Sequence, residues 1–401
     1  MPRIASPTFI RIAAAAALAA ACALGGCSTN ANTGLRPEPR QSALATSEAP
    51  SVIPSRRCAN YFLIDATING RGPYAMLLDT GASQTVISSR VLKDFAADTR
   101  PVDGTAIGSQ GKRQSLDGLL SIRTLTAGTL ELRDFTAVAL DLTTVESALG
   151  AKVDGILGYQ AFSDLLLTID YPASTVSVQR GELPPENGKS IVALTSSERP
   201  NVEVRIGNAR RTMLIDTGKG GAFSMRNLER LSTLTPPTEI TTGVAVGGTY
   251  VKKSARLAND VLLGSTVFKT PIVDTSDASN LIGAAAFTEM ALTFDQRNQR
   301  LRITPRAETP VTFPPIRGIG AGFDFTGGAW KISHVFPNSP AETVGLQPGD
   351  ILIRFNGRRL RELACKPPGD MFATGDTVRV DVVRPPRQRL TFEVPIAIVV
   401  P

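Results

Sequence analysis

The chain has 401 residues, with 43 Lys and Arg against 36 Asp and Glu, and its formal net charge is +7. This length can hold two or three domains, each with a buried core of its own. Mean hydropathy is close to zero, and the basic residues are scattered among acidic ones rather than gathered in a stripe. The composition is therefore that of a globular protein, and we expect no nucleic-acid partner.

Residues 1–26 have the pattern of a secretory signal. Arg3 and Arg11 precede an apolar run of small residues that ends in Leu-Gly-Gly-Cys at 24–27. A basic flank, a short apolar stretch and small residues before a cleavage site predict a signal peptide, and the run is short for a membrane span. Cys27 either has a function at the end of this segment or is an incidental residue after a plain signal peptide.

The Leu-Gly-Gly-Cys ending resembles the lipobox of bacterial lipoproteins. The resemblance implies that Cys27 is lipidated and becomes the new N-terminus, which anchors the protein to a membrane without spanning it. Ser28 follows the Cys where inner-membrane lipoproteins often have Asp, so the sequence favours the outer membrane. We expect a lipid-anchored protein of the bacterial cell envelope that faces the periplasm.

Residues 27–57 are rich in Ser, Thr, Pro, Ala and Asn and show no apolar period, which predicts a flexible tether. From Tyr61 onward, short alternating apolar runs are broken by Gly, Asp and Pro. Examples are 61–68, 118–125 and 174–179. This pattern predicts a mostly β protein.

Two cysteines beyond the signal and the lipidation site remain, Cys58 and Cys365. In an oxidising compartment they either form a disulfide between the first domain and the last or stay as two buried free thiols. The sequence contains no Cys-x-x-Cys motif and one His, His334, so we expect no metal site and no cofactor. His334 also gives little support to Ser-His-Asp catalysis, because it falls in a predicted strand near the C-terminus.

A sequence repeat divides the central region into two copies. Met-Leu-Leu-Asp-Thr-Gly at 76–81 returns as Met-Leu-Ile-Asp-Thr-Gly at 213–218, each time after an apolar, strand-like run. Farther along, 155–162 is matched by 280–287, and the middle of the second copy is shorter. The repeat predicts two β-rich halves in tandem, at 58–186 and 187–308.

Asp79 and Asp216 are the candidate catalytic residues. Two carboxyl groups that share one proton can hydrolyse a peptide bond, because one acts as base toward water while the other donates to the scissile carbonyl. The Gly of each motif lets the backbone pass close to the carboxylates, and the Thr can hydrogen-bond across the junction. These supporting residues are Thr80, Gly81, Thr217 and Gly218.

The two motifs resemble the pepsin and retroviral aspartic peptidase families, in which each half carries Asp-Thr-Gly and a later hydrophobic–hydrophobic–Gly element beneath it. The matching elements here are 156–158 and 281–283. The resemblance implies a bilobal β fold, a cleft for extended polypeptide substrates, and flap hairpins near 104–117 and 242–252.

The sequence departs from both families at two places and from the pepsins alone at a third. Lys219 stands where the families usually have Ser, Thr or Ala, and its ammonium either favours an ionised Asp216 or points into solvent. Ala82 lacks a hydroxyl that bonds the carboxylate in pepsins, and we expect a dyad that works nearer neutral pH than pepsin's. The pepsin flap Tyr has no clear equivalent in the first half, whereas Tyr250 lies in the second hairpin.

Residues 316–401 follow a Pro-rich break and resemble a PDZ domain of the bacterial, protease-associated type. The resemblance is carried by Ser-Pro-Ala at 339–341, Gly-Leu-Gln-Pro-Gly-Asp at 345–350 and Asn-Gly at 356–357. It implies a carboxylate-binding loop for peptide C-termini, followed by a strand that accepts the ligand by β-augmentation. The loop residues are Gly320, Ala321, Gly322 and Phe323, for which an ordinary loop is the alternative.

The leading hypothesis is an envelope aspartic endopeptidase whose PDZ domain recruits substrate or regulates access to the cleft. A non-catalytic peptide-binding scaffold, with Lys219 marking a decayed second half, is the alternative from another class. A homodimer that uses only the first half is a third possibility.

Overall fold

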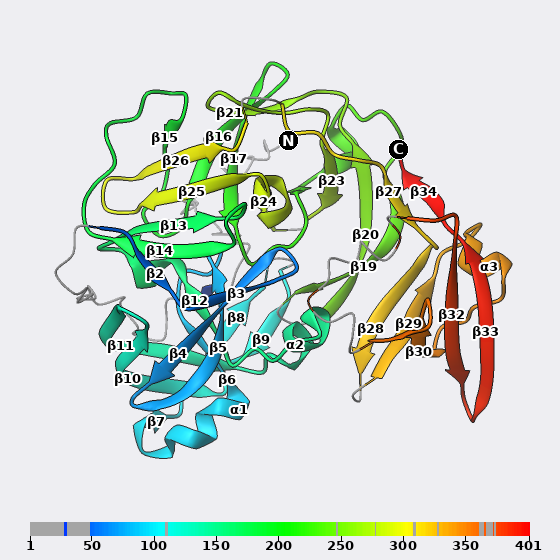
Figure 1. Cartoon of the computed structure of the whole chain (residues 1–401), viewed down its shortest axis with the longest axis horizontal. Helices are drawn as coiled ribbons and strands as arrows, with labels where there is room; N and C mark the ends of the chain where they lie inside the picture. Colours follow the sequence, from blue (N-terminus) through cyan, green and yellow to red (C-terminus); the bar gives the residue numbers. More distant parts are fainter. Residues whose placement is uncertain are drawn as a thin grey trace, which may run out of the picture.

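The computed structural model describes residues 28–29, 49–108, 111–245, 248–276, 278–307, 310–326, 329–360, 365, 372 and 374–401. The predicted signal at 1–26, Cys27 and most of the predicted tether lie outside these residues. Two β-rich lobes lie side by side, and a smaller C-terminal module sits at one edge (Figure 1). The protein is mostly β, as the sequence predicts. In the described part of the chain, no helix is long and apolar enough to cross a membrane.

The first lobe is built on an eight-stranded sheet with the order β3-β4-β5-β12-β6-β11-β10-β7, and β4 also pairs with β10. Short helices follow several strands. The strands are β3 (Ser55–Cys58), β4 (Tyr61–Ile68), β5 (Arg71–Asp79), β6 (Val86–Ser88), β7 (Thr99–Arg100), β10 (Gly118–Ala127), β11 (Leu130–Leu140) and β12 (Gly155–Gly158). The helices are α1 (Ser89–Leu92), η2 (Lys93–Asp98), α2 (Thr143–Leu149) and η3 (Tyr159–Phe162).

A small hairpin projects from the first lobe where the sequence predicts a flap. Its strands are β8 (Thr105–Ile107) and β9 (Arg113–Ser115), and we call it the first hairpin. The outer edge of β8 pairs with β1 (Ser28–Thr29), which follows directly after Cys27. An extended segment of the chain thus lies along the edge of this hairpin.

The second lobe is built on a nine-stranded sheet with the order β19-β20-β23-β18-β24-β17-β16-β21-β22. Its strands are β16 (Asn201–Ile206), β17 (Ala209–Asp216), β18 (Phe223–Met225), β19 (Thr238–Ala245), β20 (Gly248–Arg256), β21 (Val261–Leu263), β22 (Thr266–Phe268), β23 (Ile272–Thr275) and β24 (Leu281–Gly283). The 3-10 helices are η4 (Leu228–Arg230) and η5 (Ala284–Phe287). We call β19 and β20 the second hairpin, because they pair antiparallel where the second flap is predicted.

A six-stranded sheet takes strands from both repeats. Its order is β15 (Ile191–Ala193), β26 (Arg300–Pro305), β25 (Met290–Asp295), β13 (Leu166–Asp170), β14 (Thr175–Gln179) and β2 (Ser51–Ile53). In the middle of this sheet, Thr168 pairs directly with its repeat equivalent, Thr293. Such a pairing places a pseudo-two-fold axis between the two strands.

The predicted flexible tether was expected to end at residue 57, but residues 51–58 are already part of the folded protein. They form β2, which pairs with β14, and β3, which pairs with β4. Ile53 and Cys58 are fully buried. The polar composition does not predict these strands, because an edge strand can be stabilised by backbone pairing with only one or two buried apolar residues.

The C-terminal module is a separate sheet with its own core. Its strands are β28 (Ala321–Thr326), β29 (Ala329–Val335), β30 (Ile351–Phe355), β31 (Arg358–Arg359), β32 (Thr377–Arg384) and β33 (Gln388–Pro395), with α3 (Pro340–Thr343) beside them. A two-stranded ribbon of β27 (Ile316–Gly318) and β34 (Ala397–Val400) connects it to the second lobe. Its assignment as a PDZ domain stays a prediction.

The predicted carboxylate-binding loop needs a correction. Only Gly320 lies outside a strand, with a left-handed backbone (φ 74°). Ala321, Gly322 and Phe323 belong to β28 and pair with β29. The two glycines at 320 and 322 suggest a loop in the sequence, but backbone pairing with β29 makes β28 begin at Ala321.

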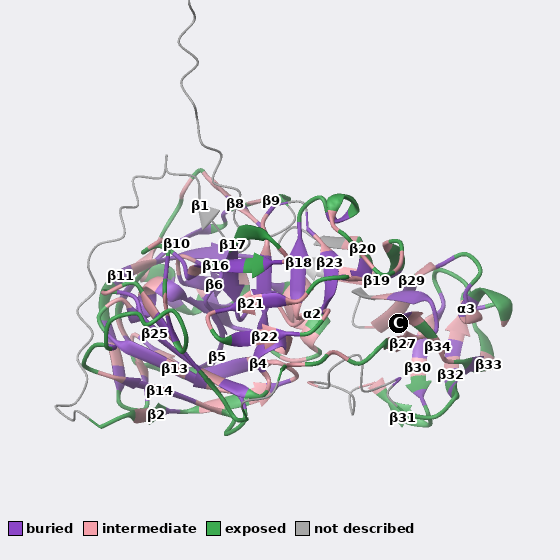
Figure 2. Ribbon diagram, turned by 90° about the horizontal axis from the view of Figure 1, so that it is seen from above, coloured by how far each residue is buried: buried purple, intermediate pink, exposed green. Residues whose placement is uncertain are grey.

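The hydrophobic cores divide the molecule into two parts. Buried residues lie in the lobes and in the module (Figure 2). One cluster runs through both lobes, a second belongs to the first lobe, and a third fills the module. A fourth, small cluster joins the module to the second lobe: Ile240 and Ile272 of that lobe pack against Val400, Ile316 and Val399 of the ribbon. The two lobes therefore share a core, whereas the module is attached at their edge.

Candidate active site

The two Asp-Thr-Gly turns occupy equivalent places in the two lobes. Asp79 ends β5 and Asp216 ends β17, and each strand turns from an exposed start to a buried end. Each pairs in parallel with a short glycine-ending strand, so that Asp79 lies opposite Gly158 and Asp216 opposite Gly283. These two strands, β12 and β24, are the hydrophobic–hydrophobic–Gly elements noted in the sequence.

Thr80 and Thr217 lock the two turns together by reciprocal hydrogen bonds. The Thr80 hydroxyl donates to the carbonyl of Ile215 at 2.7 Å and accepts from the Thr217 backbone N–H at 3.1 Å. The Thr217 hydroxyl donates to the carbonyl of Leu78 at 3.0 Å and accepts from the Thr80 N–H at 3.0 Å. Each hydroxyl is buried and satisfied as donor and acceptor by the other lobe.

The glycines allow the two loops to approach each other. A Cβ on Gly81 would lie 2.5 Å from Asp216 Cγ, and a Cβ on Gly218 would overlap the carboxyl group of Asp79. Each glycine thus passes directly over the carboxyl group of the opposite lobe. Any side chain at these positions would push the two aspartates apart.

Asp79 and Asp216 are buried side by side and hydrogen-bond each other, but their environments differ. Asp79 Oδ1 accepts backbone N–H bonds from Gly81 at 2.8 Å and Ala82 at 3.1 Å. Asp216 Oδ1 is buried with no hydrogen-bond partner among the described residues. Hydrogen bonds from N–H groups favour the ionised form, so Asp79 is the better stabilised carboxylate.

The pKa values of the pair follow from this difference. Burial raises the pKa of Asp79, while its hydrogen bonds with Asp216 and the backbone oppose the rise. Burial, and then the charge of Asp79, raises the pKa of Asp216 well above its ordinary value. The pair therefore shares one proton, and the backbone N–H bonds to Asp79 favour Asp216 as its carrier.

Comparison with known families agrees with this geometry. Residues 64–161 match the family model of an aspartyl protease. The matched segment runs from β4 to η3 and includes the first Asp-Thr-Gly turn and β12. It supports an aspartic-type protease, a hydrolase. A search of curated proteins finds no match.

Lys219 neither pairs directly with the dyad nor points into solvent. Its Nζ lies 3.4 Å from Asp274 Oδ2, and Lys252 Nζ lies 3.2 Å from the same oxygen. Ser254 donates to the other oxygen of Asp274 at 2.6 Å. Burial would raise the pKa of Asp274, but Lys252 and Lys219 hold it below its ordinary value. Asp274 is therefore ionised, and its negative charge balances much of the positive charge that Lys219 places near Asp216.

Tyr61 is a neighbour of the dyad that the sequence does not single out. Burial, and then the charge of Asp216, raises its pKa to about 12, so it stays a neutral phenol. Its hydroxyl hydrogen-bonds the backbone of Gly220. No sequence motif predicts that Tyr61 lies beside the dyad, because Tyr61 begins β4 in the first lobe and contacts the Asp-Thr-Gly turn of the second.

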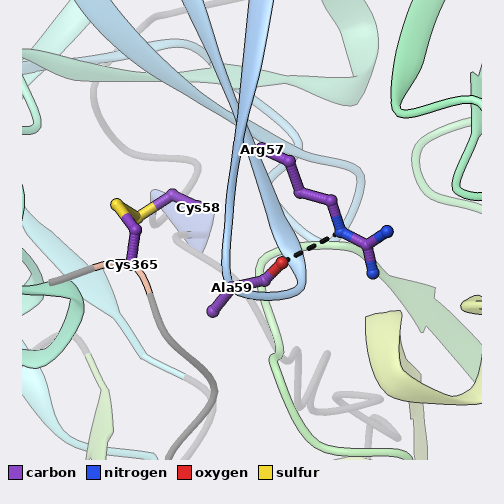
Figure 3. Close-up of a disulfide and its surroundings, with 4 residues drawn as sticks. All are labelled: Arg57, Cys58, Ala59 and Cys365. Atoms are coloured by element: carbon purple, nitrogen blue, oxygen red, sulfur yellow. Dashed lines mark hydrogen bonds between the residues drawn. A yellow bond between two sulfur atoms is a disulfide. The ribbon is translucent and has the colours of Figure 1, made fainter. Parts of the chain in front are cut away.

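The remaining predicted residues lie in other places. Tyr250 pairs with Gly243 across the second hairpin, and its ring covers that glycine. Cys58 and Cys365 form a disulfide between the first lobe and the C-terminal module (Figure 3). The four residues predicted to bind peptide C-termini are all in the module. Within the described ranges, no group of three or more His, Cys, Asp or Glu side chains is placed to hold a metal ion.

Proposed function

We propose that this protein is an aspartic endopeptidase with a dyad formed within one chain. The observation that carries the proposal is the pair of buried, hydrogen-bonded carboxyl groups of Asp79 and Asp216, each overlain by the glycine of the opposite turn. One carboxyl comes from each lobe, so a second chain is not needed to complete the pair. The match of the first lobe to aspartyl proteases supports the same reaction.

The unequal environments assign the roles. Ionised Asp79 takes a proton from water, whose oxygen attacks the scissile carbonyl carbon, while protonated Asp216 gives its proton to the carbonyl oxygen. The resulting gem-diol collapses as the C–N bond breaks. The leaving nitrogen then receives the proton held by Asp79, and a diol hydroxyl returns its proton to Asp216. Both carboxyl groups end in their starting states.

The cellular setting is part of the proposal. A lipidated Cys27 would hold the enzyme at the envelope, on the periplasmic side and at the outer membrane. The Cys58–Cys365 disulfide supports an oxidising compartment, because disulfides persist there and are rare in the cytosol. The C-terminal module would act as a PDZ domain that recruits polypeptide substrates or regulates access to the cleft.

Single Asp79→Asn and Asp216→Asn variants test the reaction, with an unfolded protein as substrate and Asp65→Asn as control. Asp65 is exposed on β4, so the control makes the same chemical change away from the dyad. We expect both dyad variants to lose at least ~10³-fold in kcat, since each role is essential, and the control to keep full activity. A wild-type protein without cleavage would support the scaffold, and loss with Asp79→Asn alone would support the homodimer.

A further inference from the structure

The turn between β3 and β4, at 58–61, lies against the loop that follows the aspartate of the second Asp-Thr-Gly motif. We call these two segments the β3–β4 turn and the 217–221 loop. Asn60 Nδ2 donates to the carbonyl of Gly220 at 3.0 Å, and the Tyr61 hydroxyl bonds the backbone of the same glycine. A Cβ on Gly220 would lie 2.4 Å from Tyr61 Oη, so the phenol rests directly on this backbone. Two side chains of the first lobe therefore hold the loop next to the second catalytic carboxyl group.

The same turn is bonded covalently to the C-terminal module. Cys58 forms the disulfide with Cys365, and the Ala59 N–H donates to the carbonyl of Cys365 at 2.7 Å (Figure 3). The N–H of Cys365 donates in turn to the carbonyl of Leu149, at the end of α2, at 3.2 Å. One short turn thus connects the module with the 217–221 loop of the second lobe.

The conformation of the turn depends on the bonds that Ala59 makes. Ala59 has a left-handed backbone (φ 54°), which an alanine adopts only where its surroundings hold it. Its N–H is held by Cys365, and its carbonyl accepts from Arg57 Nε at 3.0 Å (Figure 3). Loss of the contact with Cys365 would therefore remove one of the two restraints on this strained residue.

The two sulfur atoms of the disulfide differ in access. Cys58 is fully buried, whereas Cys365 is partly exposed, so an external thiolate reaches the Cys365 sulfur first. A thiolate of a dithiol reductant attacks this sulfur, the S–S bond breaks, and Cys58 leaves as a thiolate that takes up a proton. The second thiol of the reductant then displaces Cys365, which also becomes a thiol. Two electrons pass to the protein, and the reductant ends as a disulfide.

We propose that the β3–β4 turn is a redox-dependent clamp on the 217–221 loop, closed by the Cys58–Cys365 disulfide and opened by a dithiol. Asn60 and Tyr61 are its positioning residues, because their bonds go to the backbone of the loop. When the disulfide opens, the turn loses the bond that holds Ala59 and no longer fixes the loop. The effect on hydrolysis rests on the proposed peptidase function, whereas the clamp itself does not.

The module remains attached to the lobes when the disulfide is open. The hydroxyl of Thr242, on β19, donates to the Phe323 carbonyl of β28 at 3.0 Å. The ribbon of β27 and β34 also packs on the second lobe. The expected effect of reduction is therefore local to the turn and its loop.

Hydrogen exchange tests the clamp without reference to activity. It is measured in the full-length protein with and without dithiothreitol, a small dithiol. We expect reduction to speed exchange at 217–221 by about tenfold and to leave β13 and β25 of the six-stranded sheet unchanged. Protein with both Cys58→Ala and Cys365→Ala should exchange fast in this loop under both conditions.

Three outcomes of this experiment would overturn the inference. The first is a disulfide that the dithiol does not open in the folded protein. The second is an open disulfide with unchanged exchange at 217–221. The third is equal acceleration in the loop and in the six-stranded sheet, because the disulfide would then support only the overall stability of the protein.

Tyr61→Phe tests the clamp while the disulfide stays intact. We expect kcat to fall about fivefold with KM unchanged, and reduction to lower kcat about tenfold in the wild type but only about twofold in this variant, because the clamp is already weakened. Tyr74→Phe is the matched control, since the Tyr74 hydroxyl donates to Asp94 at 2.9 Å in the same lobe. It should behave as the wild type does.

The comparison of these variants separates the clamp from the reaction. An equal fall in kcat on reduction of the wild type and of Tyr61→Phe would overturn the inference, because the hydroxyl and the disulfide would then act independently. If exchange shows the clamp but the wild-type protein cleaves nothing, the inference stands and the proposed peptidase function fails.

Discussion

Thr80 and Thr217, one from each copy of the repeat, bind each other's loops by the same two hydrogen bonds in both directions. The four distances lie between 2.7 and 3.1 Å. This reciprocity fixes the spacing of the two aspartates, because each Asp directly precedes its Thr. The geometry of the dyad therefore depends on two side chains that need not touch a substrate.

Replacing Thr80 by Val should separate the two loops. The change leaves the buried Ile215 carbonyl and Thr217 N–H without their partner, which predicts a loss of ~2–4 kcal/mol in the free energy of unfolding and a fall in kcat. Denaturant unfolding and peptide cleavage measure the two effects. Thr168→Val is the control, since Thr168 bonds Thr293 at 3.0 Å in the six-stranded sheet. It should cost about 1 kcal/mol and leave kcat unchanged.

Gly81→Ala should abolish activity. The added Cβ would collide with the carboxyl group of Asp216, so the two carboxyl groups could not keep their contact. Gly188→Ala is a useful comparison, because Gly188 has a left-handed backbone but nothing within 4 Å of an added Cβ. It should lose about 1 kcal/mol of stability and keep its kcat. An active Gly81→Ala protein would rule out the dyad geometry.

Asp274→Asn should unbalance the charges beside the dyad. The partly buried ammonium groups of Lys219 and Lys252 would lose their counter-charge, with a predicted cost of up to ~3–5 kcal/mol in the free energy of unfolding. The excess positive charge should also lower the pKa of Asp216, so the basic limb of the kcat–pH profile should move to lower pH. Adding Lys219→Met to Asp274→Asn should restore part of the lost stability and part of the shift of the basic limb. An unchanged pH profile in the folded variant would refute this role for Asp274.

The dyad should make the free energy of unfolding depend on pH. Because the pKa of Asp216 is raised in the folded state, the native protein binds more protons than the unfolded chain between the two pKa values. This contribution to stability is complete below the ordinary pKa of Asp and is lost as pH rises through the folded value. Asp216→Asn should therefore become more stable relative to wild type as pH rises, as followed by urea unfolding. Asp65→Asn should show no such trend.

The activity of the wild type should cover a pH range above that of pepsin. Activity requires an ionised Asp79 and a protonated Asp216, and burial raises the pKa of both. The acidic and basic limbs of kcat report the two macroscopic pKa values of the coupled pair. An optimum below about pH 4, near the second pKa of the pepsin dyad, would contradict this assignment.

Local patterns in the sequence predicted much of the fold. The alternation at 61–68 corresponds to β4, and the run at 174–179 corresponds to β14 with one residue less. The repeated Asp-Thr-Gly motifs identified the two turns that the structure brings together. The end of the tether and the loop at 320–323 were predicted wrongly, because in both places backbone pairing with a distant strand extends a segment whose composition is polar or glycine-rich.

The sequence by itself determined which two aspartates form the candidate dyad, since a repeat of a motif and of its downstream elements requires equivalent positions in two similar lobes. Only the tertiary structure decided how the two differ. The phenol of Tyr61, and Asp274 as the partner of Lys219, come from segments far from Asp216 in the chain. The contact of Thr242 with β28 likewise joins the second lobe to the module. The charge state of a buried group depends on its neighbours in space, and no local pattern specifies them.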